Sequence, residues 1–140
     1  MKKRIISILL SIMLVISGIQ STVIAAVPTP DVDPLWDNTN VISPVLGFDG
    51  TTGIYSAVIS AKSGTTNISA VLTLHYENPE YAGSWIEIPT DWSFSSNSRT
   101  LAFDVEFDAP KGLTYMVQMD LEVTRNGTVE EITVQTIEEN

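Results

Sequence analysis

The sequence predicts an all-β fold, an immunoglobulin-like antiparallel β-sandwich of about seven strands, preceded by a signal peptide. Apolar and polar side chains alternate with a period of two over most of residues 41–137, as they do in half-buried strands. Turn-forming residues interrupt this alternation about every 8–12 residues, a spacing typical of two packed sheets. The chain has no cysteine, so apolar burial alone must hold the interior together. An up-and-down barrel is the alternative architecture.

The first 26 residues have the organisation of a cleavable signal peptide. Three basic residues at 2–4 precede an apolar run of about 15 residues that ends at Ile19. Ala25 and Ala26 suit signal peptidase, and we expect cleavage after one of them. A membrane anchor is the alternative, but a spanning helix needs about 20 apolar residues, and this run is shorter. We therefore expect a secreted, extracellular protein with no stable membrane anchor after cleavage.

The remaining residues divide into a linker and one domain. Residues 27–35 are rich in Pro and Asp and predict a linker or arm, and residues 36–140 predict the β-sandwich. The chain has 7 basic and 17 acidic residues, and cleavage removes three of the basic ones, which leaves a net charge of −13. Such a field repels nucleic acid and anionic lipid and favours cations or basic partners. The absence of cysteine also excludes thiol catalysis and cysteine metal sites.

Four strands are expected in the first half of the domain, at 41–48, 55–61, 68–76 and 85–88. The last of these is short and ends at Pro89, which is typical of an edge strand. Alternation predicts that one side chain in two faces the interior. The inward-facing residues of the first three strands are Ile42, Leu46, Phe48, Tyr55, Ala57, Ile59, Ala61, Ile68, Ala70, Leu72, Leu74 and Tyr76.

Three more strands are expected at 101–107, 113–123 and 129–137. Asn126-Gly127 lies between the last two, and this dipeptide is the strongest short signal for a hairpin turn because both residues accept positive φ. We expect the three strands to form a meander. Their inward-facing residues are Leu101, Phe103, Val105, Phe107, Leu113, Tyr115, Val117, Met119, Leu121, Val123, Ile132 and Val134.

Residues 36–40, 46–53 and 63–74 carry a Trp at the domain start, Gly-rich turns and strand alternation. With these features the chain resembles a group of small secreted proteins of Gram-positive gut anaerobes that have an immunoglobulin-like β-sandwich. The match covers about residues 36–76, with looser agreement at 111–115. The resemblance implies a secreted sandwich, and it supplies no activity and no catalytic residue.

Acidic side chains alternate with apolar ones along one predicted strand. Asp104, Glu106 and Asp108 share one face of it, and we expect Asp120 and Glu122 beside them on a neighbouring strand. The face is interpreted as solvated, with weak cation binding as the alternative. Catalysis by paired carboxylates is a remote alternative, because it requires a cleft and two different environments.

A second oxygen-rich segment precedes the first strand and contains Asp31, Asp33, Asp37, Asn38 and Asn40. Calcium requires six to eight oxygen ligands at one point, and this spacing does not match the EF-hand loop. We interpret the segment as a solvated linker with turn-forming residues. No cofactor is expected, and calcium is the alternative.

The most aromatic stretch of the chain contains Tyr81, Trp85 and Trp92. Exposed rings in a row stack on sugars or peptides, so these three residues are the candidate binding site. The alternative is that one Trp fills the interior and another covers a loop. Trp36 is expected to cover the edge of the sandwich.

No arrangement of residues in the sequence indicates an enzyme. His75 is the only histidine, and neither a nucleophile elbow nor a phosphate-binding loop is present. The leading hypothesis is a non-enzymatic extracellular module that binds a glycan, a peptide or a cell-surface polymer. A structural or self-assembling surface protein is the alternative, and a small hydrolase is the remote one.

Overall fold

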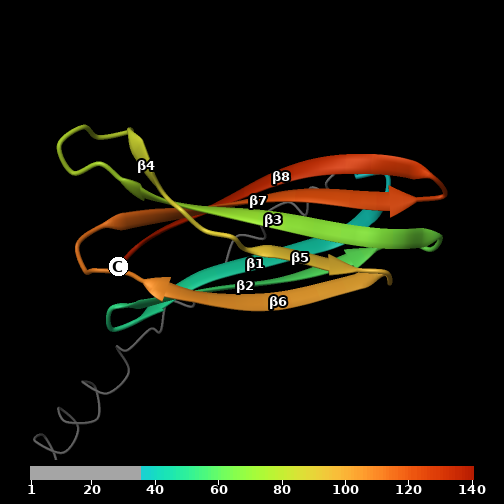
Figure 1. Ribbon diagram of the computed structural model, residues 1–140, viewed down its shortest axis with the longest axis horizontal. Helices are drawn as coiled ribbons and strands as arrows, with labels where there is room; N and C mark the ends of the chain where they lie inside the picture. Colours follow the sequence, from blue (N-terminus) through green and yellow to red (C-terminus); the bar gives the residue numbers. More distant parts are fainter. Residues whose placement is uncertain (1–35) are drawn as a thin grey trace, which may run out of the picture. The chain divides into compact units, whose positions relative to one another are not determined.

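The computed structural model describes residues 36–140, and this part of the chain contains eight β-strands and no helix (Figure 1). The predicted signal peptide and the linker at 27–35 lie outside the described residues. The strands are β1 (Thr39–Asp49), β2 (Thr52–Ala61), β3 (Thr65–Glu77), β4 (Trp85–Ile88), β5 (Ser93–Ser96), β6 (Thr100–Asp108), β7 (Thr114–Arg125) and β8 (Thr128–Glu139).

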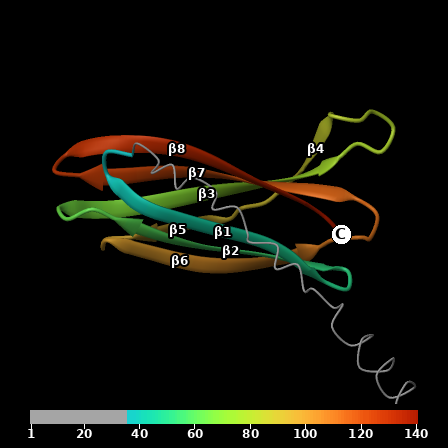
Figure 2. The ribbon, with the colours of Figure 1, turned by 180° about the vertical axis from the view of Figure 1, so that it is seen from behind.

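The strands form two antiparallel sheets that lie one above the other (Figures 1 and 2). The three-stranded sheet has the order β1-β2-β6. The five-stranded sheet has the order β4-β3-β7-β8, and β5 also pairs with β3. The chain crosses between the sheets after β2, β5 and β6, so each sheet contains strands from separate parts of the sequence. The predicted antiparallel sandwich is therefore confirmed, and such crossings are a feature of immunoglobulin-type sandwiches.

The side chains expected inside are the ones that fill the space between the sheets. Tyr55, Ile59, Ile68, Val117 and Val123 are fully buried, because alternate residues of β2, β3 and β7 point into the same interior. The edge strands β1 and β6 bury their inner residues less completely. Trp36 packs against the core from the start of the domain, as predicted.

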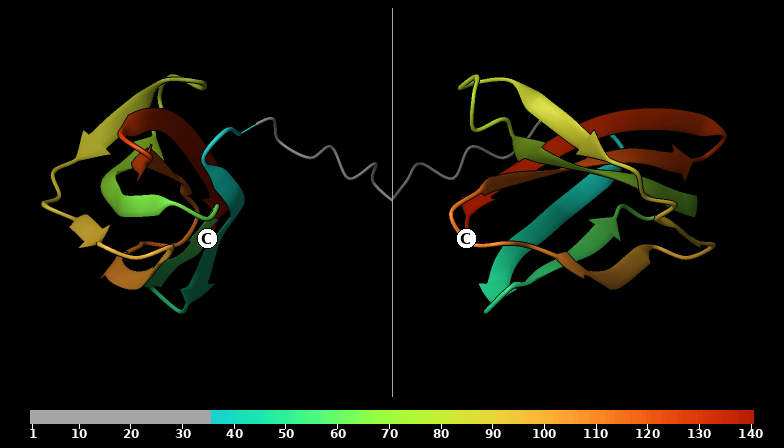
Figure 3. Two further views of the ribbon diagram at one scale, coloured as in Figure 1. Left: turned by 90° about the vertical axis from the view of Figure 1, so that its right-hand side faces the viewer. Right: turned by 60° about the vertical axis from the view of Figure 1, so that its left-hand side comes forward.

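The sequence prediction missed β5, because its residues Ser93–Ser96 include a single apolar side chain and show no clear alternation. That side chain, Phe94, stacks on Phe103 of β6 with the ring centroids 4.3 Å apart and the planes 2° from parallel. The contact joins the two sheets on the side where β5 lies next to β6. In Figure 3, β4 and the loop before it stand away from the layered strands.

The expected meander of the last three strands is wrong, because β6 belongs to the other sheet. β6 pairs with β2 from Thr52–Asp108 to Ser60–Thr100, and the chain crosses the sandwich before β7 begins. The predicted β7–β8 hairpin is confirmed, and Asn126 and Gly127 have φ of 50° and 80° at its turn.

Tyr115 fixes the crossing between β6 and β7. Its side chain is buried at the start of β7, and its hydroxyl donates to the carbonyl oxygen of Pro110 at 3.0 Å. The bond is similar to the tyrosine corner described in immunoglobulin-type sandwiches, in which a tyrosine bonds to the backbone a few residues upstream. Burial also raises the pKa of Tyr115 above its usual range, so the hydroxyl remains a donor to higher pH than that of an exposed tyrosine.

Tyr115→Phe is expected to lower the free energy of unfolding by about 1 kcal/mol, because it removes one hydrogen bond and leaves the ring in place. Urea denaturation followed by tryptophan fluorescence measures the change. Tyr81→Phe is the control, since Tyr81 is 67% exposed. Equal stability of the Tyr115→Phe and wild-type proteins would show that the corner contributes nothing.

Candidate functional site

The structure does not bring Tyr81, Trp85 and Trp92 together on one surface. Trp92 points inward and packs on the core, with its ring centroid 6.2 Å from that of Phe107. Trp85 lies opposite Glu77 on the outer side of the five-stranded sheet. Tyr81 is exposed in the loop between β3 and β4. Trp92 is therefore the tryptophan that helps to fill the interior, as the alternative to a binding site expects of one of the two.

The loop that carries Tyr81 is held by several hydrogen bonds. The backbone N–H of Gly83 donates to the Glu77 carboxylate at 2.7 Å, and that of Glu80 donates to the Asn78 side chain at 2.9 Å. The backbone of Asn78 also bonds to that of Ser84 at 2.8 Å. Tyr81 is thus a single exposed aromatic residue on a hydrogen-bonded loop, and Trp85 and Trp92 do not join it on one surface.

The oxygen-rich segment before β1 acts as a structural clasp in its described part. The Asn38 side-chain amide donates to the carbonyl oxygens of Val123 at 2.9 Å and Thr128 at 3.1 Å. The Glu130 carboxylate accepts from the backbone N–H of Asn38 at 3.0 Å and from the Thr39 hydroxyl at 2.9 Å. These bonds tie the first residues of the domain to the β7–β8 hairpin. Asp31 and Asp33 lie outside the described residues.

The two sets of acidic residues lie on opposite surfaces of the sandwich. Asp104, Glu106 and Asp108 line the outer side of β6 in the three-stranded sheet, whereas Asp120 and Glu122 are on the outer side of the five-stranded sheet. The expectation that they lie side by side is wrong, because it rested on the meander. Within residues 36–140, no three His, Asp or Glu side chains gather closely enough to hold a metal ion.

The outer side of the five-stranded sheet contains a concavity of about 440 Å³ over β3, β7 and β8. Strand register sets its side chains in two rows across the sheet. One row runs Ser69–Glu122–Glu131, and the next runs Val71–Asp120–Thr133. The lining residues are Ser69, Val71, Asp120, Leu121, Glu122, Glu131, Ile132 and Thr133. The lining therefore contains three carboxylates, two hydroxyls and no basic side chain.

A chain of hydrogen bonds orients Asp120 in this concavity. The Thr133 hydroxyl donates to Asp120 at 2.6 Å, and the Gln118 amide donates to it at 3.1 Å. The Gln135 amide donates in turn to the Gln118 carbonyl at 2.9 Å. These side chains form a polar ladder across β7 and β8, and the ladder holds one carboxylate of the concavity in a fixed position.

Glu122 and Glu131 are directly opposite each other in the β7–β8 pairing. Side chains at such positions have Cβ atoms about 5 Å apart, and like charges there destabilise the sheet. No lysine or arginine lines the concavity to compensate them. The concavity is therefore a place where the fold keeps an unfavourable pair of negative charges at the surface.

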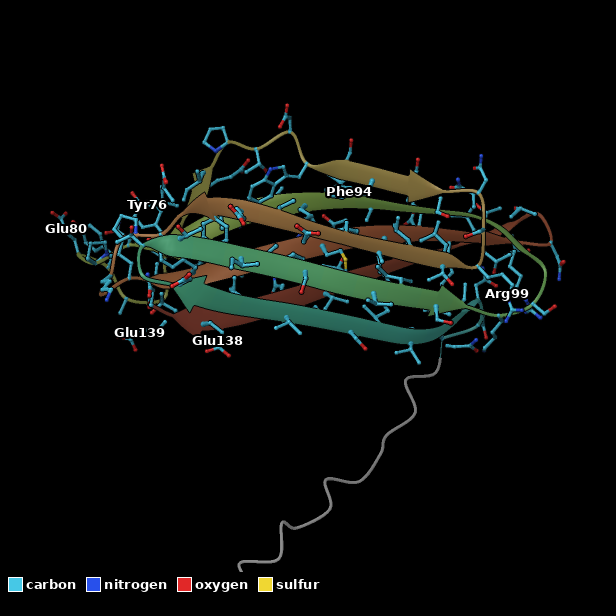
Figure 4. All side chains as sticks on the ribbon, turned by 90° about the horizontal axis from the view of Figure 1, so that it is seen from below. Tyr76, Glu80, Phe94, Arg99, Glu138 and Glu139 are labelled. Atoms are coloured by element: carbon cyan, nitrogen blue, oxygen red, sulfur yellow. The ribbon has the colours of Figure 1, made fainter. Side chains whose placement is uncertain are left out.

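Three of the four basic residues in the described domain are held elsewhere, at the loops of one end. Lys62 donates to the carbonyl oxygen of Trp36, Arg99 Nε to that of Ala61 and Arg125 Nε to that of Ser63. Figure 4 shows Arg99 at one end of the strands and Glu80, Glu138 and Glu139 at the other. Positive charge thus stabilises loops at one end and leaves the outer sheet surfaces negative.

Comparisons with known proteins assign no family to this chain. No family model matches the sequence, and no curated protein matches it. The solution structure of R. palustris CsgH aligns with a TM-score of 0.39 and 15% identity, over 66% of this chain and 88% of that chain. A likeness this weak carries no inference. The resemblance to small secreted proteins of Gram-positive gut anaerobes stays a prediction.

No helix that is long and apolar enough to cross a membrane occurs in the part of the chain that the structure describes.

Glu131→Gln is expected to raise the thermal unfolding midpoint at low salt, because it removes one charge of the Glu122–Glu131 pair and keeps the side-chain shape. Calorimetry at low salt and at about 150 mM salt measures the gain, which is expected to shrink as salt screens the pair. Glu87→Gln on β4 is the matched control for the change in net charge. A Glu131→Gln protein no more stable than this control would contradict the repulsion.

Proposed function

We propose that this chain is a secreted, non-enzymatic binding domain that holds a cationic segment of an extracellular partner in the concavity over β3, β7 and β8. The observation that carries the proposal is the lining itself, which contains Asp120, Glu122 and Glu131 and no basic side chain. A cation placed there relieves the Glu122–Glu131 repulsion, so binding removes an unfavourable interaction that is present in the free domain.

The charge of the whole domain supports a cationic partner. Residues 36–140 hold 15 of the 17 acidic residues and 4 of the 7 basic ones, a net charge of −11. Such a field attracts basic segments and accelerates their encounter with the domain. It disfavours nucleic acid, whose phosphates carry the same sign.

The shape and chemistry of the lining favour lysine side chains of a peptide. Val71 is 52% exposed on the β3 side of the concavity and offers apolar contact to the methylene stem of a lysine. The ammonium group, with three donors, then reaches the carboxylates beside it. Ser69 and Thr133 add hydroxyls for the backbone of the bound segment.

An open sheet surface supports binding better than catalysis. General acid–base chemistry requires two titratable groups in different environments, and the three carboxylates share one exposed surface. His75, the one histidine, lies between Glu87 and Met116 on the outer side of the same sheet, in a different row from these carboxylates. The protein is therefore proposed to be a module without enzymatic activity or cofactor.

A structural, self-assembling role is the second candidate function. The observation that favours it is the regular backbone edge of β8, a strand whose residues Glu131, Ile132 and Thr133 also line the concavity.

Titration of the purified protein with a lysine-rich peptide tests the proposed binding, with isothermal calorimetry at low and at physiological salt. Binding is expected to weaken as salt rises, because screening reduces the attraction. The double variant Glu122→Gln/Glu131→Gln is expected to weaken it at least about tenfold, a loss of about 1.4 kcal/mol.

The matched control is Glu106→Gln/Asp108→Asn, which removes the same charge from the outer side of the opposite sheet. This control is expected to bind the peptide nearly as well as the wild type. Equal weakening by the two double variants would show a diffuse charge effect and contradict a site in the concavity, as would an absence of binding at low salt.

A further inference from the structure

The two sheets have four edges, and three of them carry features that block the addition of another strand. Edges need such features because their unpaired N–H and C=O groups accept strands from other molecules. β1 has Pro44 in its middle and a register shift between Thr39 and Val41. The β4–β5 edge is divided into two strands of four residues by a segment that contains Pro89.

The β6 edge is closed in two ways. β5 lies next to it, and Phe94 stacks on Phe103 across the gap between the sheets. The outer side chains of β6 include Asp104 and Glu106, whose charges oppose an added acidic strand.

Within residues 36–140, β1 of the other sheet lies next to β8, as β5 lies next to β6, and Thr39 of β1 is bonded to Glu130. Between Ile132 and Ile137, however, the β8 edge has no proline, no register shift and no charge. β8 is 12 residues long and pairs with β7 without a register shift, so it is a regular, unbroken edge. Residues 132–137 contain no proline and no charge and are rich in β-branched side chains. The clasp at Glu130 covers only the beginning of the strand. Val129 and Ile137, 52% and 49% exposed, leave apolar surface on the outer side of the same strand.

We propose that β8 pairs in antiparallel register with β8 of a second copy of this chain, around a two-fold axis at Thr133. In this register Thr133 faces itself, Ile132 faces Val134, and the half-exposed Val129 faces Ile137. Glu131 then faces Gln135, so no glutamate is opposite a glutamate. Directly opposed apolar and β-branched pairs are the units that stabilise an antiparallel sheet.

Charge disfavours the registers whose axis lies nearer the C-terminal end of β8. An axis at Val134 sets Glu130 opposite Glu138, and an axis at Gln135 sets Glu131 opposite Glu139. Both registers place two pairs of like charges across the interface, which destabilises them. An axis at Ile132 also avoids like-charge pairs, but it sets Val129 opposite Gln135 and loses the pairing of Val129 with Ile137. The axis at Thr133 combines that apolar pair with the absence of like-charge pairs, and a two-fold interface requires such self-complementarity.

The pairing joins the two five-stranded sheets into one continuous sheet. It does not rest on the proposed binding of a cationic segment, although Glu131 and Thr133 belong to both surfaces, and the two respond oppositely to salt. Each copy has a net charge of −11 over residues 36–140, so salt is expected to strengthen the dimer by screening repulsion, whereas it weakens binding of a cation.

Disulfide trapping tests the register, because the wild-type chain has no cysteine. Residues directly opposite each other in an antiparallel pair have Cα atoms about 5.5 Å apart, within the range that a disulfide spans. Thr133→Cys is expected to form a covalent dimer under mild oxidation at least about tenfold faster than Ser43→Cys on the exposed side of β1. Gln135→Cys tests the register whose axis lies at Gln135, because only in that register does residue 135 face itself.

Cross-linking of Thr133→Cys no faster than Ser43→Cys would overturn the pairing, and preferential cross-linking of Gln135→Cys would overturn the register. The variants without cysteine give an independent measurement by sedimentation equilibrium over a range of concentrations. The wild type is expected to show a monomer–dimer equilibrium, and Val129→Lys to raise the dissociation constant at least about tenfold.

Val45→Lys is the matched control, since Val45 is 61% exposed on the edge strand of the other sheet. It is expected to leave the dimer unchanged. A wild-type protein that stays monomeric at high concentration and high salt would overturn the proposal, as would a dimer lost in Val45→Lys and kept in Val129→Lys.

Discussion

The pairing of β3 with β7 is the interaction on which the rest of the domain depends. These two strands lie in the centre of the five-stranded sheet, and their register extends from Thr65–Arg125 to Tyr76–Tyr115. Their inner side chains are almost completely removed from water and meet the inner side chains of β2. With no cysteine in the chain, apolar burial at this place must offset the loss of chain entropy.

The distribution of charge follows from this constraint. Because alternate residues are committed to the interior, every polar or acidic side chain of a central strand is turned to the outer surface. Basic residues are few, and three of them donate to backbone carbonyls at one end. Carboxylates therefore gather on the outer surfaces without internal partners nearby, and the strand pairing determines which of them become neighbours.

Much of the fold could be predicted from the period of two, because burial follows alternation directly. The hairpin turn at Asn126-Gly127 also fixes the β7–β8 register, so the opposition of Glu122 and Glu131 was available from the sequence. Alternation does not say which sheet a strand joins. For this reason the sequence alone predicts β6 beside β7 and Asp104 near Asp120, whereas the structure has these two carboxylates on opposite surfaces.

The aromatic residues show a second limit of the sequence. Trp85 and Trp92 are seven positions apart with a Pro-containing segment between them, so alternation cannot be counted from one to the other. The structure turns Trp85 outward and Trp92 inward, where it meets Phe107. β5 has a single apolar side chain, Phe94, and this side chain contacts Phe103 of β6. Alternation along the sequence does not predict that contact.

Amide hydrogen exchange resolved by residue measures the central claim most directly. If burial between β3 and β7 holds the domain together, the amides of Ile68–Leu74 and Val117–Val123 exchange only through global unfolding and are the slowest in the protein. The amides of β4 and β5 exchange faster, through local opening of short edge strands. Exchange in β3 and β7 as fast as in β4 and β5 would contradict the account.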